Sequence, residues 1–126
     1  MKDFRDLQVC QKAHRLTLQV YECTADFPQS ELYGLRSQIR RCSASVAANI
    51  AAGCGKRGSG EFQRFLNIAT GSASELEYRL LLSHDLRFLS NSDYEQLNAG
   101  VIEVKRMLAT RSEAGSRPSR QLKAEC

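Results

Sequence analysis

Residues 31–52, ELYGLRSQIRRCSASVAANIAA, decide the fold, because apolar side chains recur in this stretch every three or four positions. These side chains are Leu32, Leu35, Ile39, Cys42, Val46 and Ile50. An α-helix completes a turn in about 3.6 residues, so this spacing places all of them on one face. Gly53 and Gly55 follow the stretch, and glycine commonly ends a helix. The stretch therefore predicts an amphipathic helix with one buried face.

Three other segments repeat this pattern, and no segment shows the convincing alternation that marks a β-strand. One helix is expected over about residues 7–26, before a Phe-Pro pair, and another over about residues 59–89. The last helix is expected to open at Ser92, whose spacing from Glu95 is typical of a capping box. Because the joining loops are short, we predict an all-α fold, an antiparallel up-down-up-down four-helix bundle.

The whole chain has the size and composition of one ordinary domain. With 126 residues, 42% of them hydrophobic and 25% charged, it can bury a core without disulfide bonds or metals. We expect the bundle to occupy residues 1–111, and residues 112–126, SEAGSRPSRQLKAEC, to form a disordered polar tail. No apolar run approaches the roughly 18 residues of a membrane-spanning helix, and charges interrupt the N-terminus where a signal peptide is apolar. We therefore expect a cytoplasmic protein without membrane contact.

Several patterns resemble chemical motifs, but each lacks the companions that its chemistry needs. The glycines of residues 53–58 have the spacing of a dinucleotide-binding loop, which must follow a strand, whereas these follow a predicted helix. Cys10 and His14 stand four residues apart without the further ligands of a stable metal site. His84 and Asp85 are adjacent, and adjacent helical residues are not expected to face each other. The sequence therefore predicts a protein that is not an enzyme and has neither cofactor nor metal.

The net charge of +4 is unevenly distributed along the chain. Residues 34–64 hold six basic side chains against Glu61 alone, a net charge of +5. Basic groups beside a glycine-rich loop suit contacts to phosphate oxygens, and the alternative is a solvated face that only aids solubility. The candidate nucleic-acid contacts are Arg36, Arg40, Lys56, Arg57 and Arg64. Since no recognition helix, zinc finger or RNA-binding motif is visible, base-specific contacts are not expected.

A polar stripe runs beside the apolar face of the 31–52 helix. Its members, with two residues of the next helix that could face them, are Gln38, Arg41, Ser45, Asn49, Ser72 and Glu75. Buried amides and hydroxyls must find hydrogen-bond partners, so one interpretation is a structural network that fixes the register of two helices. The other is a ligand pocket. Arg41 is assigned to the stripe, with an ion pair to Glu75, and is therefore left out of the nucleic-acid contacts.

Two features exceed what a single bundle needs. One is a smooth flank of small side chains beside the apolar face, made of Ala44, Ala47, Ala48 and Ala51. The other is the run of consecutive leucines at residues 80–82, which point about 100° apart and so cannot share one core. One interpretation is an interface between subunits, and the other is a wide core with a few exposed leucines.

Most of the chain, about residues 6–111, resembles a bacterial family of four-helix bundles. The residues that carry the resemblance are Phe27-Pro28, Glu31, Gly34-Leu35, Gln38, Arg40-Arg41, Asn49-Ile50-Ala51, Gly53, Gly71-Ser72 and Glu75-Leu76. The founding members of that family are encoded by intervening sequences inserted in large-subunit ribosomal RNA genes. Two positions depart from the family pattern: Cys10 stands where tryptophan is usual, and Ala52 where glutamate is usual. Any role of that glutamate cannot be transferred to this chain.

The same family is similar to the accessory protein of diversity-generating retroelements, a basic homopentamer that associates with nucleic acid and a reverse transcriptase. The resemblance thus implies a homopentamer that binds RNA or DNA, with a reverse transcriptase or a ribonucleoprotein as a further partner. It implies no enzymatic activity. The resulting hypothesis is a non-enzymatic, oligomeric accessory protein that binds nucleic acid with low sequence specificity. The alternative is an oligomeric scaffold that binds a protein partner without nucleic acid.

Overall fold

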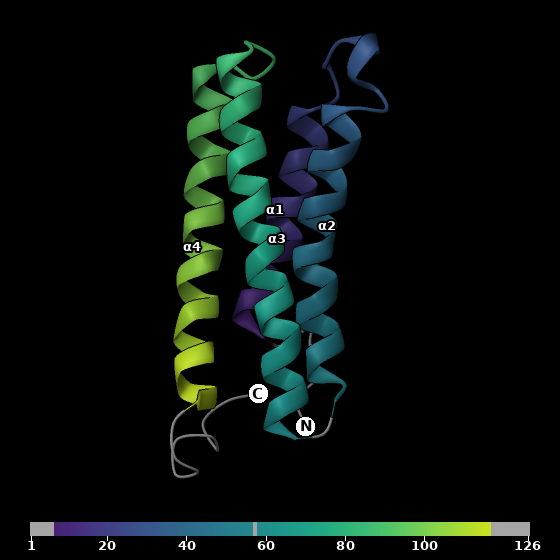
Figure 1. Cartoon of the computed structure of the whole chain (residues 1–126). Helices are drawn as coiled ribbons and strands as arrows, with labels where there is room; N and C mark the ends of the chain where they lie inside the picture. The colour runs from purple at the N-terminus through teal and green to yellow at the C-terminus, as the bar shows by residue number, and fades with distance from the viewer. Residues whose placement is uncertain (1–6, 57, 117–126) are drawn as a thin grey trace.

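The structure, a computed structural model, describes residues 7–56 and 58–116, of which residue 59 and residues 112–116 are described by their backbone alone. Within these residues the chain forms four α-helices and one short 3-10 helix, and no strand. The elements are α1 (Gln8–Cys23), η2 (Gln29–Glu31), α2 (Leu35–Cys54), α3 (Ser59–Asp85) and α4 (Asn91–Ser116) (Figure 1). The prediction of an all-α fold is confirmed.

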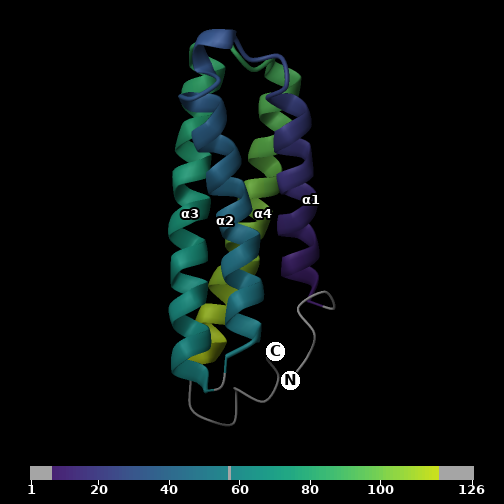
Figure 2. The ribbon, with the colours of Figure 1, turned by 90° about the vertical axis from the view of Figure 1, so that its right-hand side faces the viewer.

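Each long helix packs against two others, in the order α1, α2, α3, α4 and back to α1. In Figure 2, α2 lies in front of α4, with α3 and α1 on either side. Two contacts between α2 and α3 follow opposite chain orders on the two helices: Gln38 contacts Arg79, and Ser45, later in α2, contacts Ser72, earlier in α3. Between α1 and α4, Lys12 pairs with Glu103.

One apolar core runs between the four helices, and the predicted apolar faces supply it. In α2 the buried members are Leu35, Ile39, Cys42, Val46 and Ile50, all at most 6% exposed. From the other helices the core takes Val9, Ala13, Leu16, Val20, Phe62, Leu66, Ala69, Ala73, Leu76, Leu80, Leu97, Val101, Val104 and Leu108. Burial of these side chains is the main favourable term for the fold, since apolar area contributes about 25 cal/mol per Å² removed from water.

The start of α2 lies later in the chain than predicted, because residues Gln29–Glu31 form the separate helix η2. The carboxylate of Glu31 then accepts a hydrogen bond from the backbone N–H of Leu35, at 3.0 Å. This bond gives a partner to one of the N–H groups that have none within the first turn of α2. A Cβ at Gly34 would lie 2.9 Å from that carboxylate oxygen, so glycine leaves the space that the bond needs. Leu32, which we placed on the buried face, is half-buried in this turn.

The boundaries of α3 and α4 also differ from the sequence prediction. α3 ends at Asp85 because Arg87 adopts a left-handed backbone (φ 68°) that interrupts the helix. α4 begins at Asn91, and the side chain of Ser90 accepts a hydrogen bond from the backbone N–H of Asp93 at 3.1 Å. The cap is therefore Ser90 with its partner three residues later, and the predicted capping box at Ser92 is wrong.

The C-terminal boundary of the helical part lies beyond the predicted residue 111. α4 continues to Ser116, so residues 112–116 are helical rather than part of an irregular tail. Residues 117–126 lie outside the described part of the chain, and disorder there stays a prediction. Among the helices that the structure describes, none combines the length and the apolar character needed to cross a membrane.

Candidate nucleic-acid interface

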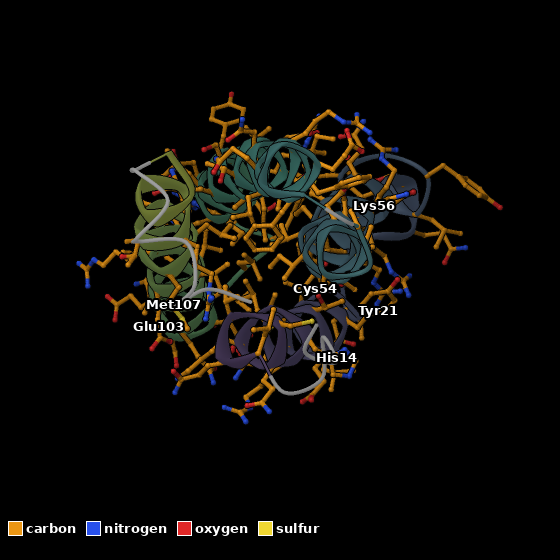
Figure 3. The ribbon with its side chains drawn as sticks, turned by 90° about the horizontal axis from the view of Figure 1, so that it is seen from below. His14, Tyr21, Cys54, Lys56, Glu103 and Met107 are labelled. Carbon is orange, nitrogen blue, oxygen red and sulfur yellow. The ribbon has the colours of Figure 1, made fainter. Side chains whose placement is uncertain are left out.

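The candidate nucleic-acid contacts fall at opposite ends of α2. Arg36 and Arg40 lie in its first two turns, whereas Lys56 follows its C-terminus and Arg64 lies in the second turn of α3. A helix of 20 residues is about 30 Å long, so the two groups do not form one patch. Seen along the helix axes, Tyr21 and Lys56 lie on the α2 side and Glu103 and Met107 on the α4 side (Figure 3). Arg57 lies outside the described residues.

The first group lines a cavity of about 460 Å³ between α1, the turn after η2 and α2, which we call the α1–α2 pocket. Its lining residues are Tyr21, Leu32, Arg36, Ser37, Arg40 and Arg41. Three guanidinium groups therefore share a small concave surface that contains no acidic side chain. Sequence reasoning missed Tyr21, Leu32 and Ser37. Tyr21 and Leu32 join the pocket only through the packing of α1 and of the turn after η2 against α2, whereas Ser37 lies on α2 itself.

Arg40 is held in place by three contacts with Tyr21 of α1 and with Thr24, the residue that follows α1. Its Nε donates to Thr24 Oγ1 and its Nη2 donates to the backbone oxygen of Tyr21, both at 2.9 Å. The guanidinium carbon also lies 4.4 Å from the centre of the Tyr21 ring, a cation–π contact. Burial and the neighbouring charge of Arg36 lower the pKa of Arg40. Arg40 is therefore a rigid wall of the pocket, and its guanidinium is charged because arginine is not deprotonated in proteins.

Arg36 and Arg41, unlike Arg40, form no hydrogen bond or salt bridge with any residue that the structure describes. Arg36 is half-buried and Arg41 is exposed. The predicted ion pair between Arg41 and Glu75 is absent, since Glu75 binds Arg79 and feels Arg41 only as a weaker electrostatic influence. Arg41 therefore belongs to the α1–α2 pocket rather than to an internal salt bridge, which corrects the sequence assignment.

The second group gathers around the ring of Phe65 on α3. The Arg64 guanidinium carbon lies 4.8 Å and the Lys56 Nζ 5.6 Å from the centre of this ring. Arg64 also pairs with Glu61, its Nε lying 3.4 Å from a carboxylate oxygen, so part of its charge is compensated. This group consequently offers phosphate a weaker and more exposed set of partners than the pocket does.

The polar stripe forms a hydrogen-bond network between α2 and α3, which we call the α2–α3 network. The hydroxyl oxygens of Ser45 and Ser72 lie 2.9 Å apart. Asn49 Nδ2 donates to the backbone oxygen of Ser45 at 2.8 Å and to its hydroxyl oxygen at 3.1 Å. Gln38 accepts a hydrogen bond from Arg79. These side chains satisfy one another, as expected of a network that fixes helix register.

Arg79 is the member of this network that sequence reasoning missed. Its Nε donates to Glu75 Oε2 at 2.9 Å, one helical turn earlier, so the charge spacing of the two residues was an available signal. Hydrogen bonds from Cys42 and Arg79 lower the pKa of Glu75. Burial and Glu75 raise the pKa of the Cys42 thiol to about 11. Cys42 is therefore an unreactive thiol that packs in the core.

Within the described part of the chain, the hydrogen bonds of His84 go to Asp85 and Asn91 and none goes to a serine, threonine or cysteine side chain. Cys10 is buried and His14 exposed, so they do not face a common site. His84 does contact Asp85, with Nδ1 and Oδ1 3.2 Å apart, although we expected adjacent residues not to meet. The pair lies at the end of α3, where His84 Nε2 is also 2.6 Å from Asn91 Oδ1. Among the described residues no three His, Cys, Asp or Glu side chains are grouped as metal ligands would be.

The features that suggested a subunit interface are partly exposed. Ala47 and Ala51 pack against the core, whereas Ala44 and Ala48 face solvent. Of the three consecutive leucines, Leu80 is fully buried, Leu82 packs at the edge of the core and Leu81 is 42% exposed. Further large apolar side chains are exposed on α3 at Ile68 and Tyr78.

Comparisons with known proteins agree with the fold. Residues 5–110 match the model of the family described as 23S rRNA-intervening sequence protein. The crystal structure of a protein of unknown function from the S23 ribosomal protein family of Bacteroides thetaiotaomicron is similar, with a TM-score of 0.76. It is 24% identical, and the alignment covers 83% of this chain and 98% of that chain, which supports the fold alone. No curated protein matches the chain.

Proposed function

Because the chain belongs to the 23S rRNA-intervening sequence protein family, we propose that it is a non-enzymatic, oligomeric accessory protein that binds nucleic acid. The proposed contact surface consists of the basic side chains of α2 and of the loop that follows it. The ligand is RNA or DNA, bound with low sequence specificity in a ribonucleoprotein or in a complex with a reverse transcriptase. We place this activity in the cytoplasm.

The observation that carries the proposal is the α1–α2 pocket. Its lining brings the guanidinium groups of Arg36, Arg40 and Arg41 together without a carboxylate, and two of them lack a protein partner among the described residues. Grouping like charges is unfavourable unless an anion joins them. Phosphate oxygens accept hydrogen bonds from guanidinium groups in a paired geometry that lysine cannot provide. A polymer of phosphates is therefore a chemically suitable ligand.

We further propose that the helices run antiparallel, up-down-up-down, and that five copies assemble into a ring. The order of the contacts between neighbouring helices supports the first part. The exposed small flank at Ala44 and Ala48 and the exposed apolar side chains of Ile68 and Leu81 support the second. Light scattering at micromolar concentration should return about five times the chain mass of 14.1 kDa. A mass near 14.1 kDa over that range would reject the assembly.

The experiment that tests nucleic-acid binding is fluorescence anisotropy with labelled RNA and DNA of graded length, at several salt concentrations. A ring presents several copies of each pocket, so affinity should rise steeply once a polymer is long enough to touch more than one subunit. Affinity should also fall as salt rises, because bound phosphates release counterions. Replacing Lys56 and Arg57 with glutamine should reduce affinity and flatten the salt dependence without changing the assembled mass. Absence of binding at low salt would refute the proposal.

The competing function is a scaffold that docks a protein partner without nucleic acid. The exposed side chains of Tyr78, Leu81 and Leu86, each more than 40% exposed, favour it. Apolar docking depends little on salt, whereas phosphate binding weakens steeply with it. The anisotropy experiment therefore separates the two functions.

A further inference from the structure

The α1–α2 pocket has an apolar wall as well as a basic one. Tyr21 is 44% exposed and Leu32 is half-buried, and both line the cavity beside the arginines. Phosphate alone requires neither side chain. A nucleotide requires both kinds of surface, because its base has a flat apolar face and its phosphate carries charge.

From this combination we infer that the pocket receives one unpaired nucleotide, with its base against Tyr21 and Leu32 and its phosphate at Arg36 and Arg41. The protein then binds single-stranded nucleic acid in preference to duplex. This inference rests on the proposed function and adds the strandedness of the ligand and the residues that read it. It assigns to the site Tyr21 and Leu32, which sequence reasoning had not considered as ligand contacts, and Arg41, which it had left out of them.

The contacts of Arg40 make this surface rigid before a ligand arrives. Its hydrogen bonds to Thr24 Oγ1 and to the backbone oxygen of Tyr21 fix the guanidinium over the Tyr21 ring. Both an aromatic ring and a guanidinium plane can stack with a base, so the pair offers a stacking surface that loses little entropy on binding. Arg36 and Arg41, which have no such contacts among the described residues, keep their donors for the ligand.

The shape of the pocket explains the preference for a single strand. The pocket has a volume of about 460 Å³ and is widely open to solvent, so it can contact one face of a base without enclosing the nucleotide. In a duplex the bases are stacked inside, so the protein meets phosphates and groove edges but no base face. Only an unpaired base can turn its face to Tyr21. A duplex would still contact the arginines and bind more weakly.

The test compares the full chain on two probes under identical low-salt conditions. One probe is a labelled RNA without self-complementarity, and the other is the same RNA annealed to its complement. We expect the single strand to bind about tenfold more tightly, since stacking of a base on an aromatic ring contributes roughly this much or more. Tyr21→Phe keeps the aromatic ring and should therefore keep the ratio of single-strand to duplex affinity. Tyr21→Leu should bring the ratio of single-strand to duplex affinity close to one, because the single strand loses the stacking surface and therefore loses more affinity than the duplex does.

Matched controls separate stacking from general effects. Tyr78→Leu removes a tyrosine that is 61% exposed on α3, outside the pocket, and should leave the ratio unchanged. Circular dichroism of each variant checks that the helices are intact. A nucleoside monophosphate should displace the single strand at a lower concentration than inorganic phosphate does.

The remaining outcomes distinguish failure of the inference from failure of the proposed function. Equal affinity for both probes, or a Tyr21→Leu variant that keeps the preference, overturns the inference while nucleic-acid binding stands. Equal displacement by inorganic phosphate and the monophosphate also overturns it, because the pocket would then bind only an anion. If neither probe binds, the proposed function fails, and the inference fails with it.

Discussion

The two flanks of α2 differ in how their polar side chains are satisfied. On the flank that faces α3, Gln38, Ser45 and Asn49 all have hydrogen-bond partners within the protein. On the flank that lines the α1–α2 pocket, Arg36 and Arg41 have none among the described residues. Polar groups that satisfy one another stabilise a fold, whereas charged groups left without partners are available to a ligand. The comparison therefore assigns structure to one flank and binding to the other.

The largest effect is expected at Gly53, where α2 passes close to Phe65 of α3. A Cβ at Gly53 would lie 3.1 Å from Phe65 Cβ, so Gly53→Leu should force the helices apart and lower the free energy of unfolding by about 2 kcal/mol. Gly71→Leu is the control, because a Cβ there meets nothing within 4 Å, and it should be neutral or slightly stabilising. Urea denaturation measures both. Equal effects of the two substitutions would disprove close packing at Gly53.

The next effect concerns the α2–α3 network. Arg79→Met removes the partner of Gln38 and Glu75, which should cost about 1 kcal/mol in unfolding free energy, less than a fully buried network would because the site is partly exposed. Nucleic-acid affinity should not change. Arg106→Met removes an equal charge from an exposed position on α4 and should alter stability by less. A large loss of affinity in Arg79→Met would contradict the division between the two flanks.

A smaller effect is expected at the contact that positions Arg40. Thr24→Val keeps the shape of a fully buried side chain but removes the oxygen that accepts from Arg40 Nε. Unfolding free energy should fall by about 1 kcal/mol, and affinity for single strands should fall a few-fold because Arg40 loses its fixed position. Thr110→Val is the control, because Thr110 is an exposed residue of α4. Unchanged affinity in Thr24→Val would show that binding does not depend on the position of Arg40.

The smallest effect is expected at the turn between α3 and α4, where the His84 side chain is hydrogen-bonded within the protein. Hydrogen bonds to Asn91 and Asp85 raise the pKa of His84. A raised folded-state pKa means that this contribution to stability is complete below the ordinary value of about 6.5 and is lost as pH rises through the folded value. Asn91→Ala should lower the His84 pKa measured by NMR titration, whereas Asn67→Ala on α3 should not. An unchanged pKa in Asn91→Ala would contradict the bond.

The sequence predicted the fold well because the three-and-four spacing of apolar residues is a local property. It missed helix boundaries that a single local feature decides. At the start of α2 this feature is the hydrogen bond from the Leu35 N–H to the Glu31 carboxylate, and at the end of α3 it is the left-handed backbone of Arg87. Of its candidate nucleic-acid contacts, Arg36 and Arg40 both line the pocket, and their binding of nucleic acid stays a prediction. It wrongly paired Arg41 with Glu75. The position of Arg41 on its helix does not reveal that Glu75 already pairs with Arg79.

The apolar half of the pocket could not have been predicted in the same way. Tyr21 comes from α1, far from α2's arginines in the chain, and Leu32, four residues before Arg36, lies in the turn after η2 and was placed on the buried face. Their meeting depends on where η2 ends and on how α1 packs against α2. Both depend on contacts between segments, which the periodicity of one segment does not encode.

The most direct test of the central claim removes two charges from the pocket and, separately, two from elsewhere. The pocket variant is Arg36→Gln with Arg41→Gln, and the control is Arg15→Gln with Arg106→Gln, both exposed positions on α1 and α4. Anisotropy with one long labelled single strand gives affinity as a function of salt. The pocket variant should bind at least about tenfold more weakly at low salt, with a salt slope reduced by about 1 to 2 per engaged subunit, while the control stays near wild type. Equal losses in both variants, or no binding by wild type, would contradict the account.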